Sequence, residues 1–305
     1  YFRRKTNDML FYFSVPVSLG YSGYWDNVGD MVNNGLEIDL NTTILNTKKF
    51  KWDVNLNMTY YKNKVTYLPE DKKSTTMDGY PGYISGEKYI AEGLPLNTWR
   101  LKKYAGVSND GIPMWYYDNE NGERQTTTNY DEADYYLCGN AMPKVYGGFG
   151  TTLSYAGVDL NVNFAYSIGG KSYDSGYSGL MTAPYADATG KNIHKDALKG
   201  WSETNPTSDI PRWQYGDLYT AAGSDRWLTN ASTLTLQNIN LGYTLPTRLT
   251  KALLINKVRL YMACDNVFYW SKRKGFDPRT SFDGSTSAGD YSQMRTISGG
   301  INIQF

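Results

Sequence analysis

The sequence has no long apolar run, almost no cysteine and a net charge close to zero. No stretch of its 305 residues approaches the roughly 18 consecutive apolar residues of a transmembrane helix, so a helical membrane protein is excluded. The two cysteines, Cys138 and Cys264, lie far apart in different kinds of segment, and we expect no disulfide between them. The net charge of +1 removes any case for nucleic-acid binding through bulk charge.

Catalytic and metal-binding groups are also scarce. The single histidine, His194, lies in a loop reading NIHKDALKG, without a Ser or Cys motif that would supply a nucleophile. A solvated loop histidine is the favoured interpretation, so we expect no catalytic residue, no enzyme activity and no cofactor. Residues 118–123 and 282–290 are rich in oxygen ligands but lack the spacing of a calcium-binding loop. Turn chemistry explains them better, and no metal site is expected.

Aromatic side chains, by contrast, are abundant. The sequence contains 28 Tyr, 8 Trp and 10 Phe, yet hydrophobic residues make up only 40% and the mean hydropathy is −0.55. Few water-soluble folds need so much tyrosine with so little leucine and isoleucine. Two aromatic girdles around a polar lumen, as in a transmembrane β-barrel, would produce this balance.

Apolar and polar side chains alternate strictly in several segments. The alternation is clearest in KWDVNLNMTY at 51–60, and it recurs in residues 34–46, 158–168 and 258–270. Such a period of two predicts β-strands with one apolar and one polar face. In a β-sandwich the apolar face would form the core; in a membrane barrel it would face lipid, and the polar face would line the lumen.

The lengths of the connections favour the barrel. We expect ten strands, at 8–19, 34–46, 51–64, 95–106, 112–118, 143–156, 158–170, 231–244, 257–270 and 294–305. Short connections at 47–50, 107–111 and Gly157, and a modest one at 245–256, alternate with long ones at 65–94, 119–142, 171–230 and 271–293. Outer-membrane barrels have short periplasmic turns and long external loops, whereas a sandwich has no reason to keep this parity. Residues 247–254 have helical spacing and predict a turn of helix on the periplasmic side.

The last strand ends on an aromatic residue. Ser298, Gly300, Ile303 and Phe305 resemble the C-terminal signal by which the barrel assembly machinery recognises outer-membrane barrels for insertion. The parity of the connections places Phe305 at the periplasmic rim. This strand would need a partner to close a barrel.

Seven blocks of sequence, taken in order, carry a family resemblance. They are NNGLEIDLN (33–41), FKWDVNLNMTYYKNKVTYLP (50–69), KKYAGVSNDGIPMWYYD (102–118), GNAMPKVYGGFGTTLSYAGVDLNVNFAYSIGGKSYDS (139–175), ASTLTLQNINLGYTLP (231–246), RLYMACDNVFYWSKRKGFDP (259–278) and MRTISGGINIQF (294–305). Together they resemble the C-terminal part of the SusC and RagA type of TonB-dependent outer-membrane transporter, found in the Bacteroidetes.

The resemblance implies an all-β, antiparallel transmembrane barrel of about 22 strands in the bacterial outer membrane. Residues 1–305 would form about its last ten strands, without the plug domain and the N-terminal strands. It also implies nutrient import without bond chemistry, with a SusD-like surface lipoprotein over the external mouth and TonB as the energy source. Substrates of the family are glycans or peptides, and glycans are weakly favoured for this chain.

The long loops are the place to look for ligand contacts. The candidate ligand- or partner-binding residues are Trp115, Tyr177, Tyr185, Trp201, Trp213, Tyr215 and Trp227. Flat aromatic rings beside polar groups suit a sugar, a peptide or a protein partner, although packing that orders a long loop explains any one of them more simply. Two other classes of protein remain as alternatives: a carbohydrate-binding β-sandwich at the cell surface and, more weakly, an outer-membrane enzyme.

Overall fold

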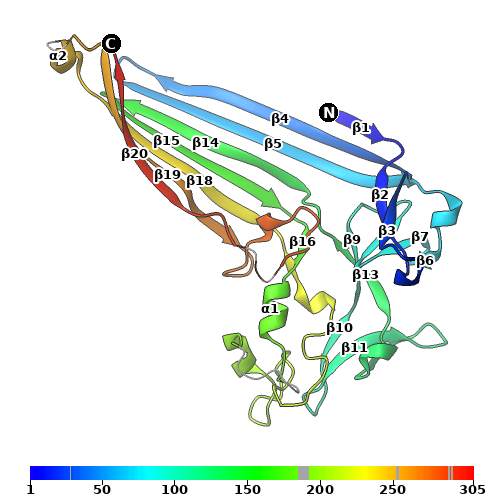
Figure 1. Cartoon of the computed structure of the whole chain (residues 1–305). Coiled ribbons are helices and arrows are strands. Elements are labelled where there is room, and N and C mark those ends of the chain that lie inside the picture. Colours follow the sequence, from blue (N-terminus) through cyan, green and yellow to red (C-terminus); the bar gives the residue numbers. More distant parts are fainter. Residues whose placement is uncertain (28, 185–191, 252–253, 288, 290) are drawn as a thin grey trace.

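One long antiparallel sheet dominates the fold. The structure, a computed structural model, describes residues 1–27, 29–184, 192–251, 254–287, 289 and 291–305. Eight strands follow one another across the sheet as a curved open wall (Figure 1). In spatial order they are β1 (Phe2–Thr6), β4 (Asp30–Asn46), β5 (Phe50–Tyr67), β14 (Val145–Tyr155), β15 (Val158–Ile168), β18 (Thr233–Thr244), β19 (Lys257–Ser271) and β20 (Thr296–Gln304).

The connections separate to the two ends of this wall. The short ones, at 47–49, 156–157 and 245–256, lie together at the end that carries the C-terminus, and the last of them contains the helical turn α2 (Thr247–Thr250) (Figure 1). The long ones, at 7–29, 68–144, 169–232 and 272–295, lie at the opposite end. Within the wall, short and long connections thus alternate as expected, but the short connection expected at 107–111 lies inside the long connection 68–144 and does not join two wall strands.

Three of the ten expected strands lie outside the wall, and β1, which was not expected, joins it, so the wall has eight strands. Residues 8–19 contain β2 (Leu10–Ser14), which pairs with β3 (Gly23–Asn27) in a separate hairpin. Residues 95–106 hold β9 (Thr98–Lys102) and β10 (Tyr104–Val107), and 112–118 hold β11 (Pro113–Asp118); all three belong to small sheets outside the wall. At four to six residues these strands are too short to cross a bilayer, which takes about 9–11.

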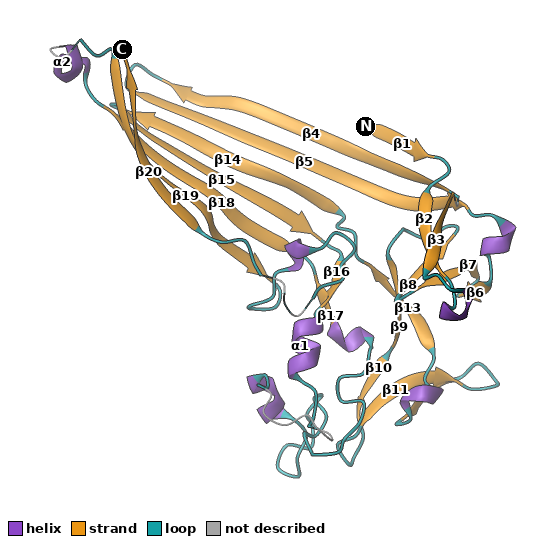
Figure 2. Cartoon of the chain, in the orientation of Figure 1, coloured by secondary structure: helices purple, strands orange, loops and turns teal. Residues whose placement is uncertain are grey.

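The described residues of three long connections, 68–144, 169–232 and 272–295, fold into a structure of their own, which we call the loop lobe. Strands β6 (Thr75–Met77), β7 (Tyr80–Ser85), β8 (Lys88–Ala91), β9 and β13 (Tyr135–Asn140) form a five-stranded sheet in the order β13-β9-β8-β7-β6. Beside it are the sheet of β10, β11 and β12 (Arg124–Thr127), the pair β16 (Lys171–Tyr173) and β17 (Leu228–Asn230), and helix α1 (Ser175–Leu180). Helix is confined to short pieces (Figure 2). Single 3-10 turns lie at Val17–Leu19, Glu70–Lys72, Tyr130–Glu132, Lys195–Lys199, Asp225–Trp227 and Pro278–Thr280.

Register makes the two faces of the wall chemically different. One row of directly opposed residues reads Leu40, Leu56, Phe149, Phe164, Leu236 and Phe268 across six strands. A neighbouring row on the other face reads Asn41, Asn55, Gly150, Asn163, Asn238 and Asp265. Opposed residues share a face of a sheet, so one face is apolar and the other is rich in amides and carboxylates.

The buried core lies mainly in the loop lobe and at its junction with the wall. Trp99, Leu101 and Cys138 form one cluster, and Met181 and Trp227 belong to another. On the apolar face of the wall, in contrast, Leu40 is 49% exposed and Phe268 is 60% exposed. No second sheet among the described residues covers that face, as a β-sandwich would require. Among these same residues, no helix is both long and apolar enough to cross a membrane.

Candidate functional site

The polar face of the wall carries a network of amide groups. Asn163 donates to the Oδ1 of Asn161 at 2.5 Å, and Asn161 donates to the hydroxyl of Thr152 at 2.8 Å. Asn238 likewise donates to Asp265 at 2.6 Å. Each amide still has further donor or acceptor capacity, so this face can hydrogen-bond a polar solute along its length.

A glycine makes room for this network in the middle of the wall. A Cβ atom on Gly150 would lie 2.3 Å from the Oδ1 of Asn163 and 2.5 Å from the Oδ1 of Asn55, far inside van der Waals contact. A larger residue at this position would displace the two amides from where they approach each other. Beside Gly150 and Asn55 the face is hollowed by about 340 Å³.

A second, larger hollow on this face lies where the wall meets the loop lobe. It has a volume of about 720 Å³, and we call it the polar-face hollow. Its lining includes Phe2, Arg4, Glu37, Tyr61, Asn63, Tyr146 and Phe282. The rings of Tyr61 and Tyr146 meet edge to face with their centroids 5.9 Å apart. Asn63 is held in place by donating to the Oδ1 of Asn33 at 2.8 Å.

Opposite charges face this hollow without partners from the protein. Among the described residues, no acidic group lies within ion-pair distance of Arg4 and no basic group within that distance of Glu37. Both side chains are exposed. A ligand with both a carboxylate and an ammonium group would find a partner for each at this hollow, beside two tyrosine rings.

Two of the aromatic loop candidates are packing residues. Trp227 is fully buried and donates from Nε1 to the carbonyl of Ala222 at 2.8 Å. Trp115 is 1% exposed, and its ring meets the edges of Tyr130 and Tyr219 at centroid distances of 5.1 and 6.2 Å. Neither side chain presents a free surface, so the simpler interpretation, packing that orders a long loop, describes both.

The other loop candidates occupy more open positions. Tyr177 is half-buried and donates to Asp196 at 3.2 Å, and Trp201 lies against the turn at Gly111. Trp213 is 41% exposed and Tyr215 is 65% exposed. Tyr185 lies outside the described residues. Trp213 and Tyr215 are therefore the two whose rings are most available to a ligand or partner.

His194 caps the 3-10 turn that follows it, Lys195–Lys199. Its Nδ1 accepts a hydrogen bond from the amide of Asp196 at 3.1 Å, and its ring packs edge-on against Tyr177 with centroids 4.8 Å apart. This is the geometry of an N-cap residue. Within the part of the chain that the structure describes, no three His, Cys, Asp or Glu residues come together as a metal site, and both cysteines are free thiols.

A buried lysine joins separate connections into one lobe. The Nζ of Lys88 lies 2.8 Å from the centroid of the Trp99 ring and donates to the carbonyl of Asp283 at 2.6 Å. Burial lowers the pKa of Lys88 to about 7. The carbonyl of the next residue, Gly284, accepts from the hydroxyl of Ser172 at 2.8 Å. Connections 68–144, 169–232 and 272–295 are thereby tied together.

The residues of the proposed insertion signal lie on the last strand, β20. Ile303 is opposite Val258 on the apolar face, whereas Ser298 and Gly300 are opposite Ala263 and Tyr261 on the polar face. Phe305 follows the strand and is 83% exposed. The alternation expected for such a signal is present, and its recognition stays a prediction.

The polar-face hollow was missed by the sequence-based predictions. Its signal was present in the doubled Tyr60 and Tyr61, because two adjacent aromatics in a strand must face opposite sides. One of them therefore had to lie on the polar face. What the sequence could not show is that Tyr146, Arg4 and Glu37 come from three other strands to meet it.

Known proteins resemble the chain in both sequence and fold. No protein-family model matches it. TonB-dependent receptor P26 of Formosa agariphila is 26% identical over 326 residues, which cover 100% of this chain and 32% of the relative. TonB-dependent receptor SusC of Bacteroides thetaiotaomicron is 25% identical over 313 residues, covering 99% of this chain and 29% of SusC.

A solved structure gives the same result. The structure described as that of the RagAB peptide transporter superposes with a TM-score of 0.83 at 26% identity, covering 99% of this chain and 32% of that chain. The chain thus spans about a third of the length of the relatives it matches. Its antiparallel wall matches part of the barrel of such a receptor, with eight strands in place of the expected ten. The chain is therefore a relative, over its full length, of the SusC- and RagA-type TonB-dependent receptors, as its seven sequence blocks predict.

Proposed function

We propose that this chain forms part of the barrel wall of an importer in the bacterial outer membrane. The observation that carries the proposal is the full-length match to TonB-dependent receptors, combined with a wall that is apolar and exposed on one face and polar on the other. The apolar face would contact lipid and the polar face would line the solute path. The short connections would lie in the periplasm and the loop lobe outside the cell.

The other parts of the transporter would lie outside this chain. Residues 1–305 correspond in this proposal to the C-terminal portion of the barrel, and the plug domain and the earlier strands belong to other parts of the transporter. TonB would act through those parts. A SusD-like lipoprotein would cover the external mouth, where the exposed Trp213 and Tyr215 offer the kind of aromatic surface that protein interfaces use.

The chemistry of the polar-face hollow favours an oligopeptide as the solute. Arg4 and Glu37 would pair with the carboxylate and ammonium groups of a peptide, and Tyr61 and Tyr146 would pack against its apolar side chains. The resemblance to a peptide transporter supports the same choice. The weak preference for glycans that the sequence suggested is the alternative, because tyrosine rings and amides also bind sugars. Selectivity in either case would come from these wall residues rather than from any bond chemistry.

Uptake by a strain that carries the complete transporter tests the proposal. We expect Tyr61→Ala to lower uptake of a fluorescent oligopeptide by about tenfold, since an aromatic contact in a binding site is worth roughly 1–2 kcal/mol. Tyr155→Ala is the matched control, because Tyr155 is 58% exposed and lies at the other end of the wall. Uptake should be measured at equal amounts of protein in the outer membrane.

The same strains can decide the solute. Loss of labelled oligosaccharide uptake with unchanged peptide uptake in Tyr61→Ala would establish the glycan alternative. If deleting the whole transporter changed neither uptake, the importer proposal itself would fail.

A further inference from the structure

The apolar face of the wall changes character near the loop lobe. Its last apolar row contains Leu36 and Tyr60, which are directly opposed. Two residues further along β5, Lys62 is opposite Asn34, and Asn34 is in turn opposite Arg3 of β1. Two residues further again, Lys64 is opposite Val32, whose other neighbour is Lys5. Opposed residues share a face, so four cations lie on the apolar side of the wall, just beyond its apolar rows.

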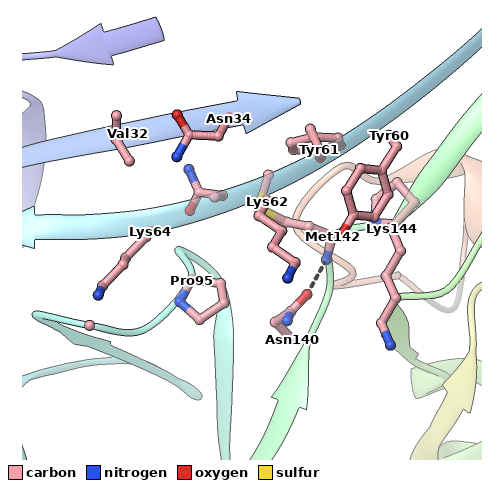
Figure 3. Close-up of a pocket in the computed structure, with 13 residues that line it drawn as sticks. Val32, Asn34, Tyr60, Tyr61, Lys62, Lys64, Pro95, Asn140, Met142 and Lys144 are labelled. Atoms are coloured by element: carbon pink, nitrogen blue, oxygen red, sulfur yellow. Dashed lines mark hydrogen bonds between the residues drawn. The ribbon is translucent and has the colours of Figure 1, made fainter. Parts of the chain in front are cut away.

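A hollow of about 610 Å³ opens beside two of these cations, Lys62 and Lys64 (Figure 3), whereas Arg3 lines the polar-face hollow. Lys62 and Lys64 extend from β5 toward Pro95 and Asn140 of the loop lobe, and Lys144 lies at its other side. Asn140 is fixed by accepting a hydrogen bond from the amide of Met142 at 3.0 Å. The hollow thus has Lys62 and Lys64 on the strand side, and mainly apolar residues with Asn140 and Lys144 on the lobe side.

Most of these charges are not neutralised within the protein. Lys5 pairs with Asp30 at 3.1 Å. No acidic group among the described residues lies within ion-pair distance of Arg3, Lys62, Lys64 or Lys144. All four of these side chains are exposed. The three of them that line the hollow, Lys62, Lys64 and Lys144, are complementary to an anionic headgroup.

The position of the hollow indicates that the anionic group would belong to a membrane lipid. At about 3.4 Å per residue, Lys62 lies ~7 Å and Lys64 ~14 Å along the strand beyond Tyr60. In the proposed membrane orientation, this is the level of the headgroups of the outer leaflet. Basic residues at a membrane surface attract anionic lipids, and basic pockets beside membrane-spanning elements bind their headgroups.

We propose that this hollow binds the phosphate-bearing headgroup of an outer-leaflet lipid. Lys62, Lys64 and Lys144 would surround the phosphate, Asn34 and Asn140 would hydrogen-bond the neighbouring polar groups, and the acyl chains would lie along the row of Tyr60 and Leu36. The site would fix the depth of the barrel in the membrane at the point where the wall meets the loop lobe. The inference depends on the proposed membrane orientation but not on the transported solute.

Native mass spectrometry of the complete transporter, released from detergent micelles, tests this site. The probe is dioleoylphosphatidylglycerol, with dioleoylglycerol as a lipid without phosphate and inorganic phosphate as the anion without acyl chains. We expect the wild type to retain phosphatidylglycerol in preference to both. Lys62→Glu combined with Lys64→Glu should weaken this binding by about tenfold or more, because two cations at the headgroup level are reversed.

Matched variants make the result specific. Lys48→Glu combined with Lys49→Glu reverses two exposed lysines in the short connection at the opposite end of the wall, and it should leave binding unchanged. Lys62→Gln combined with Lys64→Gln removes the two charges without reversing them and should weaken lipid binding less than the double Glu variant. It replaces the double Glu variant in the test if that protein does not assemble in the membrane. Equal binding of dioleoylglycerol, equal binding of inorganic phosphate, or unchanged binding in the double Gln variant would overturn the proposal. Peptide uptake is a separate readout, so failure of lipid binding leaves the transport proposal standing.

Discussion

Leu40→Arg is expected to lower the free energy of unfolding of the barrel by about 2–4 kcal/mol. Leu40 lies near the middle of β4 on the apolar face, opposite Leu56, and is 49% exposed. A leucine on this face does not destabilise the folded barrel when lipid covers the face. A guanidinium at the bilayer midplane does, because it loses its hydration. Urea unfolding of the complete transporter in lipid vesicles, followed by tryptophan fluorescence, measures the change.

The adjacent residue provides the control for this prediction. Asn41 lies at the same depth on the polar face, where its amide donates to Asp39 at 2.6 Å. Asn41→Arg should change the free energy of unfolding by less than about 1 kcal/mol, because a side chain that lines a lumen stays hydrated. Equal destabilisation by the two arginines would show that the two faces have the same surroundings, which contradicts a wall with lipid on one side and water on the other.

Trp227→Ala is expected to destabilise the loop lobe by about 3–5 kcal/mol, the usual cost of removing a large buried aromatic side chain. Its ring is fully buried, packs against Met181 and Ala197, and lies 4.6 Å beneath the guanidinium of Arg226. The substitution leaves a cavity and also removes the hydrogen bond to Ala222. Hydrogen exchange of residues 169–232 in the complete transporter measures the effect.

Trp213→Ala separates packing from ligand contact. Trp213 is 41% exposed and donates only a 3.3 Å hydrogen bond to the carbonyl of Thr182, so its loss should leave hydrogen exchange of the lobe nearly unchanged. If Trp213→Ala lowered the hydrogen-exchange protection of the lobe as much as Trp227→Ala, burial would not explain which of the two residues stabilises the lobe. Lower uptake in Trp213→Ala with intact lobe protection would assign that ring to a ligand or a partner.

The wall could be predicted because its pattern is local. Residues 51–64 alternate at a period of two, and each side chain then has a defined face without knowledge of any other strand. Residues 95–106 and 112–118 were wrongly expected in the wall because a short strand in a small compact sheet gives the same local pattern. Thr98, Trp99 and Leu101 are all buried, and that depends on contacts with β13 and β16 that no local pattern contains.

The candidate site was predicted less well than the wall. The loop aromatics were chosen by residue type, and type does not distinguish the buried Trp115 from the exposed Tyr215. The polar-face hollow combines residues from β1, β4, β5 and β14, which the sequence separates by more than a hundred positions. A site assembled from many strands becomes visible only when the register across the sheet is known.

The proposed membrane orientation requires lipid against the apolar face of the wall and water against the polar face. Its sharpest test places a single bimane-labelled cysteine at each position from 54 to 59 of β5, after replacement of Cys138 and Cys264, and records quenching by brominated acyl chains. We expect strong quenching at positions 54, 56 and 58 and weak quenching at 55, 57 and 59, because side chains alternate between the faces. Quenching that fails to alternate, or that is strongest at Asn55 and Asn57, would contradict this orientation.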